Sequence, residues 1–474
     1  MLSFKNQLRP GLRLAGKKIT VMGLGLYEDG SGISATRFLV SRGAKVTVTD
    51  LKTRQQLAPQ LKRMGALKNK VKLVLSEHRE KDFKNVDLIV KNPGVPSTSK
   101  FLKIAKENQI PIETDISLFF QLVDKKRIIG ITGTRGKSTT TTLIYNLIKT
   151  IDRKAVLGGN ITKSPLAQMQ QVKQNGKIVL ELSSWMLESL EPHQISPHLA
   201  VFTNIYPDHL NTYASMKEYA AAKENIFKWQ TPQDFVILNR DNSWTKKMGA
   251  KVIGQRFWFS KKYFSEENGC FLKNNWVYFR QNGQEQKVLN IKNIKLLGEH
   301  NWENILAAVG AAMILGIKIK NIKRVVENFR GVPNRLELLR EIKGVKYYND
   351  TTSTTPEATM AALRALGKNK NIILIAGGSD KGLDFQKLAV EIKRCCRTAI
   401  LLQGTGTQRL AKEFSILNFQ FSIVGSMADA VGAAKSLAKH GDIILLSPAC
   451  ASFGMFNNEF DRGEQFRKIV GKLK

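Results

Sequence analysis

The sequence predicts an α/β protein of three domains, each built on a parallel β-sheet. Short runs of β-branched and aliphatic residues alternate with helical stretches along the chain, as in βαβ units. Many of these runs end in a glycine-rich or polar loop, and a parallel sheet binds ligands at that edge. The length of 474 residues exceeds that of one ordinary domain. We place the domains at residues 1–123, 124–331 and 332–474.

The first domain begins with a nucleotide-binding pattern. A strand over 18–22 runs into a glycine loop that starts at Gly23, a helix is expected over 33–42, and the strand over 45–50 ends in Asp50. Such a carboxylate lies where a ribose or base is read in Rossmann-like domains. A later strand, 86–90, leads into the turn Asn92-Pro-Gly94. The glycine loop departs from G-x-G-x-x-G, so a nicotinamide-dependent oxidoreductase is only an alternative.

The second domain contains the strongest motif, Thr132-Gly-Thr-Arg-Gly-Lys-Ser138. It lies between a buried strand over 128–131 and a helix over 139–148. Gly133 and Gly136 permit a backbone path that points N–H groups at a polyphosphate, beside the positive end of the helix. Lys137 adds a charge for the β- and γ-phosphates, and the Ser138 hydroxyl can bind Mg²⁺. We therefore predict a P-loop ATPase domain.

Other polar residues of this domain follow strands or share a helix face. Glu181 ends a strand that starts at residue 177, His209 follows a strand that starts at 200, and Lys223 lies in a helix over 216–229. Glu181 could hold Mg²⁺, cap a helix or lie at the surface. On spacing alone, a histidine such as His209 is more often structural and a lysine such as Lys223 more often solvated than catalytic. Asn301 and Asn304 share a helix face that could bind a purine or cap the helix.

Residues 251–297 alternate aromatic runs with Asn/Gly turns, which predicts a small antiparallel patch within the second domain. In the third domain, buried strands begin at residues 345, 372, 399 and 442, and helices lie between them. This alternation predicts a second Rossmann-like sheet whose carboxyl edge faces a ligand.

The composition is strongly cationic. Lys and Arg number 74 against 39 Asp and Glu, a net charge of +35, which attracts polyanions such as nucleotides, nucleic acid or anionic lipid. The charge is spread along the chain without a compact basic motif, so we do not expect nucleic-acid binding as the main function, and a nucleic-acid-dependent ATPase stays an alternative. The four cysteines lack metal or redox spacing, and no apolar run could form a signal peptide or span a bilayer. We expect a cytoplasmic protein without membrane contact.

The motifs taken together resemble the Mur ligase family, ATP-dependent enzymes that add amino acids to the peptidoglycan precursor. The resemblance covers essentially the whole chain and is most specific near the C-terminus, where it is similar to members that join D-glutamate to UDP-N-acetylmuramoyl-L-alanine. Besides the phosphate loop, it is carried by Gly158-Gly-Asn160, Glu181-Leu-Ser-Ser184, Asp208-His209, Tyr219-Ala-Ala-Ala-Lys223, His300-Asn301 with Asn304, Arg335, Asn349-Asp350, Gly377-Gly378 with Lys381, and Ser447-Pro-Ala-Cys-Ala-Ser-Phe-Gly-Met-Phe456 with Arg462-Gly463.

This resemblance implies a role for each matching residue. ATP would contact Gly133, Thr134, Arg135, Gly136, Lys137, Ser138, Thr139, Asn301, Asn304, Arg335 and Asp350. Two Mg²⁺ ions would be held by Ser138 and Glu181 and by His209 and a carbamylated Lys223, with Lys137, Glu181, His209 and Lys223 as the catalytic set. The UDP substrate would contact Asp50, Asn92, Gly94, Asn160 and Ser183, and glutamate would contact Thr354, Lys381, Ser452 and Phe453.

The implied reaction starts with attack of the substrate carboxylate on the γ-phosphate of ATP. The amino group of glutamate then displaces phosphate from the acyl phosphate, in a site that excludes water. We expect a monomer. The sequence departs from the family at Arg135, Thr352, Leu210 to Thr212 and Glu459. These departures leave open the same ligase chemistry with L-glutamate or another amino acid.

Overall fold

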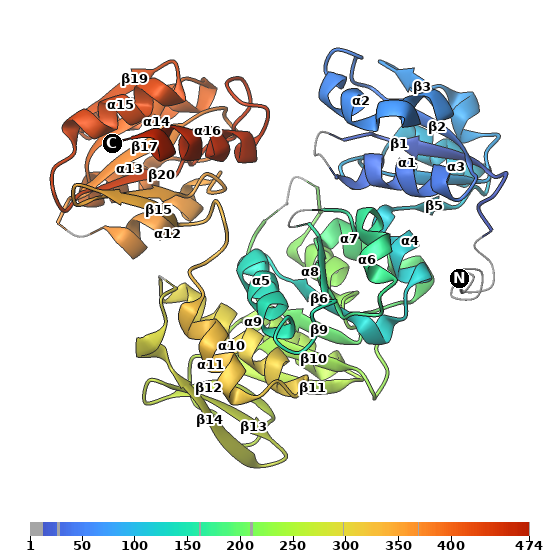
Figure 1. Cartoon of the computed structure of the whole chain (residues 1–474), viewed down its shortest axis with the longest axis horizontal. Helices are drawn as coiled ribbons and strands as arrows, with labels where there is room; N and C mark the ends of the chain where they lie inside the picture. Colours follow the sequence, from blue (N-terminus) through green and yellow to red (C-terminus); the bar gives the residue numbers. More distant parts are fainter. Residues whose placement is uncertain are drawn as a thin grey trace. The chain divides into compact units, whose positions relative to one another are not determined.

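The computed structural model describes residues 13–25, 29–160, 163–208, 212–296, 298–367 and 369–473. Three β-sheets with flanking helices confirm the predicted α/β class (Figure 1). The chain divides into two compact units, residues 1–294 with 300–328 and residues 295–299 with 329–474. The first unit contains two of the sheets and the second unit contains the third. The domain limits predicted at 123 and 331 stay predictions.

The first sheet has the strand order β3-β2-β1-β4-β5, and all of its strands are parallel. Val46 and Val48 of β2 are buried on one face, in a core that also contains residues of α1 and α2. On the other face, α3 and a short 3₁₀ helix cover Met22 and Ile89. The elements are β1 (Lys18–Met22), α1 (Ser31–Ser41), β2 (Lys45–Asp50), α2 (Ala58–Met64), η2 (Gly65–Lys70), β3 (Lys72–Leu75), η3 (Glu80–Phe83), β4 (Leu88–Lys91), α3 (Lys100–Glu107) and β5 (Ile112–Glu113).

The central sheet has the strand order β14-β13-β12-β11-β10-β9-β6-β8-β7. Its β-branched and aliphatic strands are almost fully buried, as expected for parallel strands covered on both faces. The strands are β6 (Ile128–Thr132), β7 (Val156–Gly159), β8 (Ile178–Glu181), β9 (Leu199–Phe202), β10 (Phe235–Asn239), β11 (Gln255–Ser260), β12 (Gly269–Lys273), β13 (Trp276–Gln281) and β14 (Gln284–Asn290).

The predicted antiparallel patch is part of this central sheet. Strands β12, β13 and β14 pair antiparallel, which confirms the patch. Strand β11 instead runs parallel to β10 and β12, so the prediction was wrong for Gln255–Ser260. The chain returns to the sheet in the same direction after α9 and a 3₁₀ turn, which supply the crossover that parallel strands require.

Helices cover the central sheet, and two of them differ from the predicted limits. Helix α5 begins at Lys137 rather than 139, because Gly136 in a left-handed conformation is its N-cap. Helix α8 ends at Glu224 rather than 229, since the next residues form tighter i→i−3 turns. The helices are α4 (Asp115–Leu122), η4 (Lys125–Arg127), α5 (Lys137–Ile148), η5 (Pro165–Gln168), α6 (Met169–Val172), α7 (Ser184–Glu188), η6 (Glu191–His193), α8 (Met216–Glu224), α9 (Ser243–Met248), η7 (Gly249–Lys251), η8 (Ile291–Asn293), α10 (His300–Ile314) and α11 (Ile319–Asn328).

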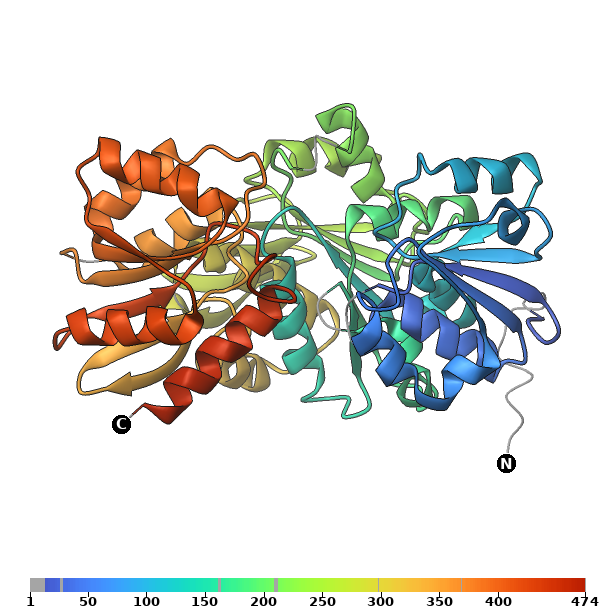
Figure 2. The ribbon, with the colours of Figure 1, turned by 90° about the horizontal axis from the view of Figure 1, so that it is seen from above.

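The second unit is built on a sheet of order β15-β16-β20-β17-β18-β19. Only β15 is antiparallel to its neighbour, and α16, deep red in Figure 2, packs against β15 and β16. The elements are β15 (Glu337–Ile342), β16 (Val345–Asn349), α12 (Pro356–Leu366), β17 (Ile372–Gly377), α13 (Gln386–Cys395), β18 (Cys396–Leu402), α14 (Thr405–Ile416), β19 (Phe421–Val424), α15 (Met427–Leu437), β20 (Ile443–Leu446) and α16 (Glu459–Lys472).

Two further predictions concern the cysteines and membrane-spanning segments. All four cysteines are free thiols and all are buried. Within the described ranges, none of the helices has both the length and the apolar character that a membrane span requires.

Candidate active site

The carboxyl ends of four neighbouring strands of the central sheet meet at one edge. In the strand register, Ile131 of β6 lies beside Glu181 of β8, and Glu181 lies beside Gly159 of β7. On the other side of β6, Thr132 lies beside Phe202 of β9. The phosphate loop, Asn160, Glu181 and the segment after β9 therefore leave the sheet together, as the sequence predicted.

The phosphate loop connects β6 to α5 and depends on its glycines. Gly133 has φ +147° and Gly136 has φ +80°. A Cβ atom at Gly133 would lie 1.9 Å from Thr203 Oγ1, and one at Gly136 would lie 2.1 Å from Asn304 Oδ1. Neither position can carry a side chain without displacement of the loop. In the first turn of α5, the backbone N–H groups of Ser138 and Thr139 have no acceptor within the helix, so they can bind an anion.

Two residues after β9 hold the loop in place. Asn204 accepts hydrogen bonds from the N–H groups of Thr134, at its backbone carbonyl (2.8 Å), and of Arg135, at its side-chain oxygen (2.9 Å). Thr203 donates to the carbonyl of Arg135 (2.6 Å). Sequence reasoning missed both residues, although their position after a strand of the same edge was a usable signal. Through these bonds the backbone of Arg135 is fixed while its side chain is exposed.

Lys137 and Lys223 meet at one backbone carbonyl. Lys137 Nζ lies 2.9 Å and Lys223 Nζ lies 3.2 Å from the carbonyl oxygen of Gly133. Lys223 is only 2% exposed, and burial together with the charge of Lys137 lowers its pKa well below the ordinary value, while Asp208 and Glu181 act in the opposite direction. The Lys223 side chain therefore gives up its proton readily, and a neutral amine is a nucleophile.

Glu181 is the carboxylate of this edge. It is 2% exposed, and its Oε1 accepts a hydrogen bond from Asn160 Nδ2 at 3.0 Å. Its Oε2 is buried without a hydrogen-bond partner among the described residues. A buried carboxylate oxygen without a donor is costly unless a cation or water satisfies it, and oxygen is the ligand type that Mg²⁺ prefers. The donor set therefore fits one magnesium ion, with the Ser138 hydroxyl as a second candidate ligand.

The expected ligand His209 lies outside the described residues. Within the described ranges, no group of three or more His, Cys, Asp or Glu side chains is placed to hold a metal ion. The expected second site combines His209 with a carbamylated Lys223. That site stays a prediction.

Asn301 and Asn304, expected near adenine, are buried on α10. Asn304 Nδ2 donates to Asn301 Oδ1 (2.8 Å), and Asn304 Oδ1 accepts a hydrogen bond from Thr140 of α5 (3.3 Å). Asn304 thus ties α10 to the helix that follows the phosphate loop. This contact gives Asn304 a structural task that neither the capping nor the purine-binding interpretation anticipated.

Of the residues expected to contact the UDP substrate, Asp50, Asn92 and Gly94 lie at the carboxyl edge of the first sheet. Asp50 is 4% exposed, and its two oxygens accept hydrogen bonds from the N–H groups of Leu24 and Lys52, each 2.9 Å long. Asn92 accepts a hydrogen bond from the N–H of Gly94 (3.0 Å). Both side chains therefore shape loops at this edge. Ser183, also expected to contact the substrate, caps α7 through a bond from the N–H of Met186.

In the second unit, Asp350 holds the turn that carries Arg335. Its carboxylate accepts hydrogen bonds from the N–H of Leu336 (3.1 Å) and the hydroxyl of Ser447 (2.7 Å). Burial raises the pKa of Asp350 to about 6, although the bonds from Ser353, Ser447 and Leu336 and the charge of Arg335 lower it. Arg335 itself is exposed. Asp350 and Arg335, the two residues of this unit that are expected to contact ATP, therefore lie near each other.

The residues expected to bind the amino acid come together in the second unit. Lys381 donates to the hydroxyl of Thr354 at 3.0 Å. Ser379 pairs through its backbone with Ala451, next to Ser452, and its hydroxyl donates to the carbonyl of Phe453. Ser452 is buried, whereas the ring of Phe453 is exposed. These loops follow β16, β17 and β20, which are neighbours in the sheet, so a lysine and hydroxyls gather at one edge.

Arg462 of α16 holds two of these loops, a role that sequence reasoning did not assign. Its guanidinium is fully buried and donates to Thr351 Oγ1 (3.0 Å), to the carbonyl of Thr351 (2.9 Å) and to the carbonyl of Cys450 (3.3 Å). Burial lowers the pKa of Arg462 to about 10, so the side chain remains charged at neutral pH. Arg462 therefore fixes the loops after β16 and β20 relative to each other.

Comparison with protein families gives three matches along the chain. The Mur ligase MurD-like, N-terminal domain matches residues 17–114, the Mur ligase middle domain matches residues 131–312, and the Mur ligase, glutamate ligase domain matches residues 334–450. The matches follow one another in chain order and include most of the residues discussed above.

Two relatives match this chain over almost the whole of both sequences. The UDP-N-acetylmuramoylalanine--D-glutamate ligase of Roseiflexus sp. (strain RS-1) is 40% identical over 97% of this chain and 99% of that protein. The enzyme of the same name from Borreliella burgdorferi (strain ATCC 35210) is 38% identical over 96% of this chain and 97% of that protein.

Solved structures share the fold. The UDP-N-acetylmuramate-alanine ligase MurC of Thermotoga maritima aligns with a TM-score of 0.62 over 97% of this chain and all of that chain, at 20% identity. A pseudomurein peptide ligase type C from Methanothermus fervidus aligns with a TM-score of 0.56 at 21% identity, again over 97% of this chain and all of that chain. At this identity the likeness concerns the fold.

Proposed function

The chain belongs to the Mur ligase family, and we propose that it joins D-glutamate to UDP-N-acetylmuramoyl-L-alanine by an amide bond. Enzymes of this family are ATP-dependent ligases of peptidoglycan precursor synthesis, so ATP hydrolysis drives the reaction. The observation that carries the proposal is the convergence of Lys137, Lys223 and Glu181 at the start of α5.

This convergence suits the first chemical step. A substrate carboxylate must approach the γ-phosphate of ATP, and two anions repel unless positive charge lies between them. The N–H groups of the first turn of α5 and the ammonium of Lys137 bind and orient the phosphates. Lys137 is already directed toward the loop, since it donates to the carbonyls of Gly133 and Thr134.

Magnesium would supply further positive charge for the phosphates at this site. Ser138 and Glu181 would hold one ion, and His209 with Lys223 would hold a second. When bound, Mg²⁺ neutralises charge on the phosphate oxygens and favours attack by the carboxylate. The unsatisfied Oε2 of Glu181 supports this assignment.

We propose that Lys223 acts as a carbamate. Its amine is buried, close to the charge of Lys137, and loses its proton readily, so it can react with carbon dioxide. The N–C bond that forms and the proton that leaves turn a cationic side chain into an anionic oxygen ligand. This conversion removes the repulsion with Lys137 and provides the oxygen ligand that a second Mg²⁺ requires.

The second step needs glutamate held by its carboxylates. Lys381 and Thr354, which already contact each other, offer an ammonium and a hydroxyl for one carboxylate, and Ser452 and the backbone near Phe453 supply further polar contacts. The amino group of glutamate attacks the carbonyl carbon of the acyl phosphate, the C–O bond to phosphate breaks, and the amine loses a proton. Arg462 positions the loops that carry these residues.

The remaining parts of the proposal concern the UDP substrate and the state of the protein. The loops held by Asp50 and Asn92 would bind UDP, with Asn160 and Ser183 toward the muramoyl end. We propose a cytoplasmic monomer that requires neither nucleic acid nor a membrane. The same chemistry with L-glutamate or another amino acid is the second candidate, because Glu459, whose backbone carbonyl accepts a hydrogen bond from Thr351, stands where the family resemblance implies an aromatic residue near the amino-acid loops.

Phosphate release with matched amino acids tests the proposal. With ATP, Mg²⁺ and UDP-N-acetylmuramoyl-L-alanine present, we expect D-glutamate to stimulate release strongly and L-glutamate, D-aspartate and L-alanine to stimulate it weakly. Stimulation by L-glutamate alone would select the second candidate. No stimulation by either isomer would contradict both, and release stimulated by DNA or RNA would favour the nucleic-acid-dependent ATPase.

A further inference from the structure

The first sheet has an open area on the face that α3 and η3 only partly cover. Between β3 and β4 the chain forms only the four-residue 3₁₀ helix η3, where a longer helix would cover the sheet. The segment around η3 packs over β1, where Thr20 donates to the carbonyl of Asp82 (2.6 Å). The amino-terminal ends of β2 and β3 remain accessible, since Lys45 and Lys72 are exposed and Thr47 is half-buried.

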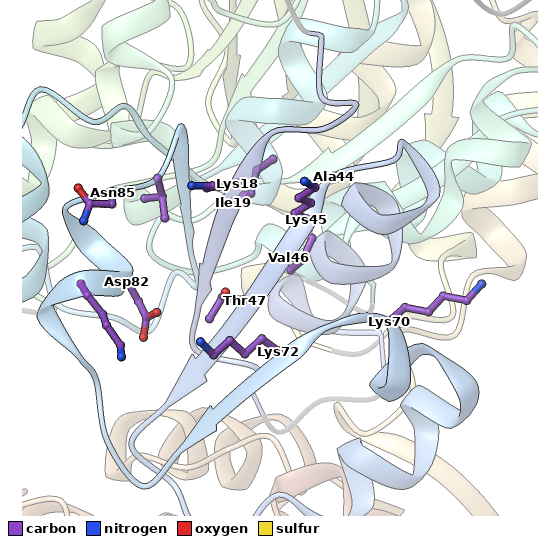
Figure 3. Close-up of a pocket in the computed structure, with 12 residues that line it drawn as sticks. Lys18, Ile19, Ala44, Lys45, Val46, Thr47, Lys70, Lys72, Asp82 and Asn85 are labelled. Atoms are coloured by element: carbon purple, nitrogen blue, oxygen red, sulfur yellow. The ribbon is translucent and has the colours of Figure 1, made fainter.

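A groove of about 560 Å³ lies at this place, which we name the amino-edge groove. Figure 3 shows Lys18, Thr47 and Lys72 on the strands, facing the segment that carries Asp82 and Asn85. The lysines of its lining are Lys18, Lys45, Lys70, Lys72 and Lys81. Its size is within the range of roughly 300–1,000 Å³ that is typical of small-molecule sites.

The lining is strongly cationic, and nearby carboxylates compensate only a small part of its charge. Five lysines from separate elements line the groove, against the single carboxylate of Asp82. That carboxylate is already held by Arg79, with bonds of 2.8 and 3.1 Å. Nearby Asp87 is engaged by Lys17 Nζ and by the backbone N–H of Lys18. Among the described residues, no carboxylate lies within 4.0 Å of the five ammonium groups.

The groove is separate from the expected UDP site. Lys45 begins β2 and Asp50 ends it, so at about 3.3 Å per residue the two positions lie about 17 Å apart. The strand register places Lys18 beside Lys45, and Thr47 beside Lys72, on the same face of the sheet. These lysines therefore lie together at the amino-terminal edge, opposite the edge that the proposed ligase reaction uses.

We propose that the amino-edge groove binds a small anion that carries two or more phosphate groups. Lysine ammonium groups bind phosphate as point charges, and several of them around one concave site favour a ligand with more than one phosphate. Thr47 and Asn85 add a hydroxyl and an amide that can bond phosphate oxygens. A concave groove fits a compact ligand better than a flat membrane surface does. This site does not depend on the proposed ligase activity.

Local labelling of lysines tests the proposal on the full chain. The protein is acetylated with a lysine-selective reagent, with and without inorganic tripolyphosphate, and each lysine is quantified by mass spectrometry. We expect labelling of Lys18, Lys45, Lys72 and Lys81 to slow at least about fivefold. Labelling of Lys246 and Lys247, exposed lysines of α9, should not change. Equal slowing at all lysines, or no slowing in the groove, would overturn the proposal.

A pair of double variants supplies the matched control. Lys45→Gln/Lys72→Gln should weaken tripolyphosphate binding at the groove about tenfold by calorimetry, whereas Lys246→Gln/Lys247→Gln, with the same loss of charge, should not. Stronger protection by a nucleoside triphosphate than by tripolyphosphate would assign a nucleotide, and equal protection would assign the phosphate chain alone. Protection by a short DNA strand without protection by tripolyphosphate would overturn the proposal in favour of a nucleic-acid surface.

Discussion

At the scale of single residues, the burial of Lys223 and the nearby charge of Lys137 determine the reactivity of the Lys223 amine. Replacing it by alanine should lower the ligation rate at least about a hundredfold, because a ligand of the second Mg²⁺ would be lost, while the fold persists. Short carboxylic acids should restore part of the activity by occupying the place of the carbamate. The measurement is the steady-state rate of phosphate release together with circular dichroism. Lys217→Ala, an exposed lysine on the same helix, is the control, and an unchanged rate for Lys223→Ala would refute the metal assignment.

Asp350 predicts a pH dependence of stability. Its pKa rises from an ordinary 3.8 to about 6 in the folded protein, so the folded state binds this proton more tightly than the unfolded state does. The free energy of unfolding should therefore fall by up to about 3 kcal/mol from this group as pH rises from about 4 to about 6, and then level off. Denaturant titrations of the wild type and Asp350→Asn at several pH values measure the difference. A difference that does not change with pH would contradict the burial argument.

Sequence reasoning identified residues by motif but not by the bonds that hold them. The phosphate loop and Glu181 were predictable because their residue types and strand-end positions carry chemical meaning, whereas the role of Lys223, a helix residue, was implied only by the family resemblance. Asn204 and Arg462 were not predicted as supports, since nothing in the sequence shows which backbone groups they reach. His209 lies outside the described residues, so the residues at the second metal position stay predictions.

At the scale of elements, the turn from β6 into α5 depends on Gly136. Gly136→Ala should abolish ATP binding, because the added Cβ would lie 2.1 Å from Asn304 Oδ1 and displace the loop. Gly316→Ala is the matched control: it has a similar φ of +71° but no atom within 4 Å of the added Cβ. The control should lose only about 1–2 kcal/mol of stability from the left-handed conformation, and should bind ATP normally in calorimetry. Normal ATP binding by Gly136→Ala would contradict this account of the loop.

Elements with strong patterns were predictable, and those set by tertiary pairing were not. The buried strands around 128–131 and 372–377 carry unbroken apolar runs, and the structure has them as β6 and β17. The edge strand β15 has the pattern Glu-Leu-Leu-Arg-Glu-Ile, in which charged residues obscure the alternation, and it pairs only because β16 is beside it. The direction of β11 likewise depends on its crossover and not on its own residues.

At the scale of the whole molecule, the net charge of +35 has consequences of its own. Self-repulsion of a strongly charged protein opposes association, which supports the proposed monomer. Light scattering at moderate salt should give a mass close to 53.1 kDa across a range of protein concentrations. A mass that doubles with concentration would contradict it. The α/β fold class was predictable because βαβ alternation recurs along the chain, whereas the basic groove on the first sheet arises only when separate strands are brought together.

The central claim is that the enzyme transfers the γ-phosphoryl group of ATP to a substrate carboxylate. The most direct test uses UDP-N-acetylmuramoyl-L-alanine with ¹⁸O in both carboxylate oxygens. If the carboxylate attacks phosphorus and glutamate then displaces phosphate, each inorganic phosphate released carries one ¹⁸O atom and the amide carbonyl keeps the other. Mass spectrometry of the phosphate decides the matter: one ¹⁸O per phosphate is the predicted result, and amide formation with unlabelled phosphate would contradict the account.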